Sequence, residues 1–117
     1  MTASIALACV VALIFAALGL SKILALTPMR TLAAKVGFST TAYRRIGVLE
    51  VAGAAGVALG LARPLLGALA GAGLLALLAG AVATHLRHGD RPQAVAPAVV
   101  CALLVSGYLA TLFGVLP

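Results

Sequence analysis

Charged side chains are scarce in this chain. Of its 117 residues only 9% are Asp, Glu, Lys or Arg and only two are acidic, whereas 64% are hydrophobic. A water-soluble protein of this size could not bury so much apolar surface. The composition excludes a soluble globular domain and predicts one transmembrane domain over residues 1–117, since about 20 apolar residues cross a bilayer as a helix.

Cysteine and aromatic residues are also few. Cys9 and Cys101 are the two cysteines, no CxxC motif occurs, and aromatic residues make up 4% of the chain. A thiol or quinone reductase of the vitamin K epoxide reductase type needs paired cysteines, and a cation-binding cage needs several aromatic rings. No catalytic or redox motif is found, which favours a non-enzymatic role; direct catalysis would need a cofactor that leaves no motif.

The amino-terminal segment has no charged side chain in its first 21 residues. A cleaved signal peptide would begin with a positively charged region, so this run is interpreted as a retained span. Further apolar runs follow, and Arg63 and Pro64 separate two of them. The pattern predicts an all-α fold, an integral membrane four-helix bundle with spans at about 3–26, 46–62, 65–84 and 98–116.

The loop after the first span, LTPMRTLAAKVGFSTTAYRR at 26–45, is long enough for an element of its own. Thr27 suits an N-cap, Pro28 a first helical turn, and Gly37 a helix end. Apolar residues recur at helical spacing here and share one face. A short amphipathic helix in the membrane surface is predicted, with a disordered basic loop as the alternative.

Basic residues flank the spans unevenly. The first and third loops hold six of them, whereas Arg63 alone lies on the other side; the six are Arg30, Lys35, Arg44, Arg45, Arg87 and Arg91. Positive loops stay in the cytoplasm, so both chain termini are expected outside it. The basic residues do not form one patch with aromatic partners, which argues against nucleic-acid binding.

Two opposite charges lie at one depth within the predicted spans. Lys22 is about 6 Å inside the cytoplasmic end of the first span, and Glu50 enters the second span from the same side. A single unpaired charge near mid-helix costs roughly 2–3 kcal/mol on insertion scales. An ion pair is therefore predicted. In the alternative, Lys22 extends to the headgroups and Glu50 meets Arg44 or Arg45.

Three further residues complete the candidate polar site with Lys22 and Glu50. His85 and Arg87 end the third span at the same cytoplasmic level. Tyr108 lies deeper in the fourth span than an interfacial tyrosine would, so its hydroxyl needs a partner, either another helix or a ligand. The HLRH sequence around His85 lacks the context of a metal site, and no metal is predicted.

Glycine, by contrast, is abundant, with 13 residues. Small residues let helices approach closely in lipid, where no hydrophobic effect drives their association. Gly67 and Gly71 form a GxxxG pair. The pattern leaves open whether these glycines pack the bundle internally or contact a second protomer.

Several of these segments together resemble a known family. GLSKI at 19–23, GVLEVAGAAGVALG at 47–60, ATHLRHGD at 83–90 and a proline-led last span are similar, in this order, to the DoxX-like family of small bacterial membrane proteins. The resemblance covers nearly the whole chain. It implies a four-helix protein of the bacterial inner membrane whose lysine and glutamate correspond to Lys22 and Glu50.

What the resemblance implies about function is an accessory role. Relatives are linked to membrane oxidoreductase assemblies, so we expect a non-catalytic accessory or anchor subunit, with a membrane oxidoreductase or a second copy as partner and a quinone or lipid as ligand near Lys22 and Glu50. A small proton-coupled transporter of the multidrug-exporter type is the alternative, because such exporters also combine four helices with one membrane glutamate.

Overall fold

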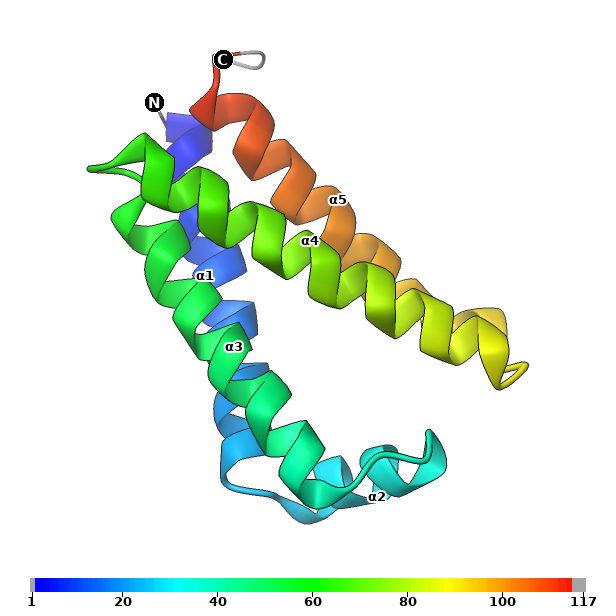
Figure 1. The fold of residues 1–117 in the computed structure, drawn as a ribbon. Coiled ribbons are helices and arrows are strands. Elements are labelled where there is room, and N and C mark those ends of the chain that lie inside the picture. Colours follow the sequence, from blue (N-terminus) through cyan, green and yellow to red (C-terminus); the bar gives the residue numbers. More distant parts are fainter. Residues whose placement is uncertain (1, 115–117) are drawn as a thin grey trace.

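The computed structural model describes residues 2–114, and within them all regular structure is helical. The elements are α1 (Thr2–Ile23), α2 (Thr27–Lys35), α3 (Thr40–Leu59), α4 (Pro64–Arg87) and α5 (Pro92–Leu112) (Figure 1). The predicted all-helical class is confirmed. The short α2 lies in the loop where a separate helix was expected.

Three of these helices, α1, α4 and α5, are long and apolar enough to cross a membrane. The helix α3 is not among them, because its 20 residues include Arg44, Arg45 and Glu50. The predicted span at 46–62 therefore stays a prediction. The described residues form five helices, of which three qualify as spans, so the predicted bundle of four spans also stays a prediction.

The helices begin where capping residues and prolines allow, not where the apolar runs begin. The Ser39 hydroxyl accepts a hydrogen bond of 3.0 Å from the Ala42 N–H and so starts α3 before its apolar part. Pro64 and Pro92 open α4 and α5, since a first-turn residue needs no N–H partner. Gly89, with φ of +66°, follows the end of α4.

At α2 one capping prediction is right and one is wrong. Gly37 has φ of +78° and ends the helix, and the Phe38 N–H bonds back to the Ala33 carbonyl at 2.8 Å. Thr27, however, is the first residue of the helix and not its cap; Leu26 precedes it and offers no capping side chain. The turn from α1 is made by Ala25 in the left-handed region, with φ of 51°.

The long helices pack in two pairs. The helix α1 lies along α3 and α4 lies along α5, while α3 also contacts α4 and α1 also contacts α5. In Figure 1 the pairs converge near both termini and the α3–α4 turn, and they diverge toward α2 and the α4–α5 turn. The buried core joins all four helices through residues such as Val11, Val57, Leu74, Val105 and Tyr108.

Glycines allow close approach at three contacts between the helices. A Cβ atom on Gly47 would lie 2.6 Å from the Gly19 carbonyl oxygen, so α1 and α3 touch there. Likewise a Cβ on Gly60 would lie 2.5 Å from the Gly67 Cα, and one on Gly71 would lie 2.6 Å from Leu109. The GxxxG pair thus packs against helices of the same chain.

A glycine substitution tests the first crossing. Gly47→Ala should lower the free energy of unfolding by about 1–3 kcal/mol, because a methyl group there must push the two backbones apart. The matched control is Gly73→Ala, where an added Cβ meets no described atom within 4 Å. Thermal unfolding in mild detergent measures both. Equal effects of the two substitutions would contradict the proposed backbone contact.

Candidate functional site

A cavity of about 850 Å³ lies between the two helix pairs, and all five helices contribute to its wall. Most of the lining side chains are apolar, among them Phe15, Leu18, Leu77 and Leu78. Cys101 also lines it and is a free thiol. The space is partly open to the outside, and its volume lies within the range of about 300–1,000 Å³ that is typical of ligand pockets.

Lys22 and Glu50 meet in the wall of this cavity. The Lys22 Nζ lies 2.5 Å from the Glu50 Oε1, and the two side chains are only 12% and 5% exposed. Each follows its helix's crossing glycine, Gly19 or Gly47, by three residues, which is nearly one turn. The helices α1 and α3 run in opposite directions (Figure 1). A Cβ on Gly19 would meet Val51, whereas one on Gly47 would meet Ile23. Lys22 and Glu50 therefore both lie in the stretch between the two glycine contacts, which brings their side chains together.

Tyr43 extends this contact and was not foreseen from the sequence. The Lys22 Nζ lies 5.4 Å from the centre of the Tyr43 ring, within cation–π range. The Phe38 ring meets Tyr43 edge to face, with centroids 6.1 Å apart. Tyr43 precedes Glu50 by seven residues, or two helical turns, and this spacing is the signal that places both on one face of α3.

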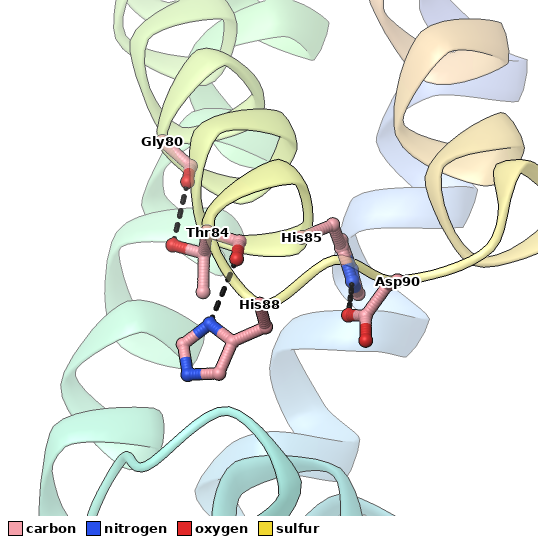
Figure 2. Close-up of polar contacts among 5 residues, drawn as sticks. All are labelled: Gly80, Thr84, His85, His88 and Asp90. Atoms are coloured by element: carbon pink, nitrogen blue, oxygen red, sulfur yellow. Dashed lines mark hydrogen bonds and ion pairs between the residues drawn. The ribbon is translucent and has the colours of Figure 1, made fainter.

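His85 lines the cavity from α4 but has a partner of its own. Its Nδ1 lies 2.7 Å from the Asp90 Oδ2 in the α4–α5 turn, and the side chains are 25% and 27% exposed (Figure 2). Figure 2 shows the His88 ring on another side of the helix, with its Nδ1 2.9 Å from the Thr84 carbonyl oxygen. Within residues 2–114 no three His, Cys, Asp or Glu side chains are grouped to hold a metal ion.

Arg87 and Tyr108, also predicted for the polar site, do not reach it. Arg87 is exposed and lies outside the cavity wall, because two residues after His85 correspond to about 200° around the helix. Tyr108 is fully buried, and its hydroxyl donates to the Val57 carbonyl at 2.8 Å. Its partner is therefore another helix and not a ligand.

The Tyr108 hydroxyl completes the carboxyl end of α3. There the Leu61 N–H bonds to Ala58, three residues back, and not to Val57, four residues back. In a longer helix the Val57 carbonyl would accept a hydrogen bond from the Leu61 N–H; here it accepts one from the Tyr108 hydroxyl instead. The same hydroxyl occupies the space where Gly60 and Gly67 lack side chains.

Comparison with known proteins places the chain in a family. The model of the DoxX-like family matches residues 6–107, so the chain belongs to this family. No curated protein and no solved structure matches the chain. The matched region includes every residue that lines the cavity.

Removing the Tyr108 hydroxyl should destabilise the fold without altering the cavity. Tyr108→Phe leaves the buried Val57 carbonyl without its donor, at a cost of about 1–3 kcal/mol in the free energy of unfolding. Tyr43→Phe is the matched control, since the ring beside Lys22 is retained. Unfolding of both variants in detergent gives the comparison, and a loss no larger for Tyr108→Phe than for the control would rule out this capping role.

A double-mutant cycle measures the contact between Lys22 and Glu50. Lys22→Met should destabilise the protein because it leaves a buried carboxyl without a partner. Adding Glu50→Gln should restore much of that loss, with a coupling energy of about 0.5–3 kcal/mol. Arg44→Met combined with Glu50→Gln is the control, since Arg44 is exposed. Additive effects in both cycles would show that the two side chains do not interact.

Proposed function

We propose that this protein is a non-catalytic accessory or anchor subunit of a redox-linked assembly in the bacterial inner membrane, with a small lipophilic ligand, quinone-like or lipid, in its cavity. Membership of the DoxX-like family and three apolar helices support the membrane setting. The observation that carries the proposal is the mostly apolar cavity with Lys22 and Glu50 in its wall.

In this proposal α3 is the fourth span. Its Arg44 and Arg45 lie exposed in the first turns, where they reach the headgroups. Its only other charge, Glu50, contacts Lys22 and so enters the membrane with a partner. In Figure 1 the basic α2 and α4–α5 turn lie away from the end that holds both termini. The positive-inside rule then puts that basic end in the cytoplasm.

The Lys22 ammonium is suited to hold a carbonyl-bearing ligand. It has three N–H donors, and the contact with Glu50 uses one of them. A second donor can reach a ligand oxygen at the cavity wall, while the apolar lining receives the rest of the molecule. Such a site binds and orients a lipophilic molecule without itself supplying a reaction.

Proton-coupled export of cations has less support. An exporter needs a carboxylate that releases its proton to bind the substrate cation. Glu50 is in contact with Lys22, and Asp90, the other acidic residue of the chain, contacts His85. Both carboxyls therefore have partners from the chain itself.

Filling the cavity tests the proposal. Ala81 lines the cavity, whereas Ala83 on the same helix is exposed outside it.

Protein purified in mild detergent from its native membranes should carry a quinone or lipid and a membrane oxidoreductase identified by its activity. Ala81→Trp should reduce the bound molecule at least tenfold, and Ala83→Trp should retain it.

Thermal unfolding of each variant shows whether it is folded. Recovery of a folded wild-type monomer with neither a bound lipophile nor an oxidoreductase would refute the proposed role.

A further inference from the structure

The charges that line the cavity do not balance. Its cationic side chains are Lys22, Lys35 and Arg91, and its carboxyls are Glu50 and Asp90. These two are the only acidic residues in the whole chain. Glu50 contacts Lys22, and Asp90 contacts His85. A histidine carries charge only when protonated, so contact with His85 does not by itself cancel the Asp90 charge. Three cationic side chains thus face two carboxyls, and the cavity wall keeps an excess of one positive charge.

The two lining cations outside the contact of Lys22 with Glu50 lie at the mouth of the cavity. Lys35 and Arg91 both line it and are both solvent-exposed, and they come from opposite elements, α2 and the residue that precedes α5. The inner wall, in contrast, includes the buried side chains of Phe15 and Leu78, at 2% and 8% exposure. The cavity thus changes from apolar inside to charged at its rim, where Asp90 also lies, and cations outnumber carboxyls among its lining side chains.

From this charge distribution we infer that the cavity selects an anionic phospholipid, with one acyl chain among the apolar side chains and the phosphate between Lys35 and Arg91. The inference rests on the proposed ligand-binding role and decides between its two classes of ligand. A neutral quinone leaves the excess positive charge of the wall without a counter-charge. A zwitterionic lipid brings a cation of its own to the rim.

The two side chains suit a phosphate in different ways. The Arg91 guanidinium can donate two parallel hydrogen bonds to phosphate oxygens. Lys35 has a long flexible stem, so its ammonium can follow the headgroup while its methylenes cover apolar surface. Each basic residue near an anionic headgroup adds to the attraction. For the two residues together this corresponds to roughly a 10- to 30-fold preference for an anionic over a neutral headgroup.

Lipid titration into the full-length protein in detergent tests this assignment. The probes are phosphatidylglycerol and phosphatidylcholine with identical chains, and native mass spectrometry counts the lipids bound. Wild-type protein should bind phosphatidylglycerol at least tenfold more tightly. The preference should disappear in the Lys35→Gln, Arg91→Gln variant and persist in the control Arg44→Gln, Arg45→Gln, which removes two exposed charges outside the cavity wall.

Several results would overturn the inference. Equal affinity for the two lipids would do so, as would equal loss of the preference in the test and control variants. One such result is that the two lipids bind with equal affinity, or that a neutral quinone analogue binds as tightly as phosphatidylglycerol. If Ala81→Trp then abolishes that binding, the ligand-binding role stands and the anionic class is wrong. If Ala81→Trp leaves all binding unchanged, the cavity is not the site and both proposals fail.

Discussion

The contact of α1 with α3 is the constraint on which the candidate site depends. Gly19 and Gly47 bring the two backbones together, and Lys22 and Glu50 lie in the stretch between these two contacts, where the ammonium meets the carboxyl. Neither feature is sufficient alone. Without the glycines the two charges would stand too far apart, and without one of the charges the other would be left buried and unpaired, which is costly.

The cavity is a consequence of how the remaining helices are attached. The α4–α5 pair contacts the α1–α3 pair through the core near Tyr108, and the space toward α2 is left between the pairs. Polar groups from both pairs line this space, with Glu50 on one side and His85 on the other. Each contacts a neighbour from its own side, and Lys35 and Arg91 are the lining cations outside these two contacts.

Helix class and the meeting of one lysine with one glutamate were within reach of the sequence, because apolar runs and charge depth depend on local spacing. That Arg87 lies apart from His85 was also within reach, since two residues correspond to about 200° around a helix. The separation of Tyr108 from the cavity was not, because it follows from tertiary packing, which no local pattern encodes. Tyr43 was accessible in principle, since it lies two turns from Glu50 on the same face of α3.

The close packing at the junction of Gly60, Gly67 and Tyr108 affects how far the other end of α4 can move. The junction lies near the start of α4 (Pro64–Arg87), and the helix extends about 30 Å beyond Gly67. Any change in the tilt of α4 at this junction would therefore be amplified at its far end. A tilt of about 5° would move the far end by roughly 3 Å for a rod of this length, so the width of the opening is set by packing at the opposite end of the molecule.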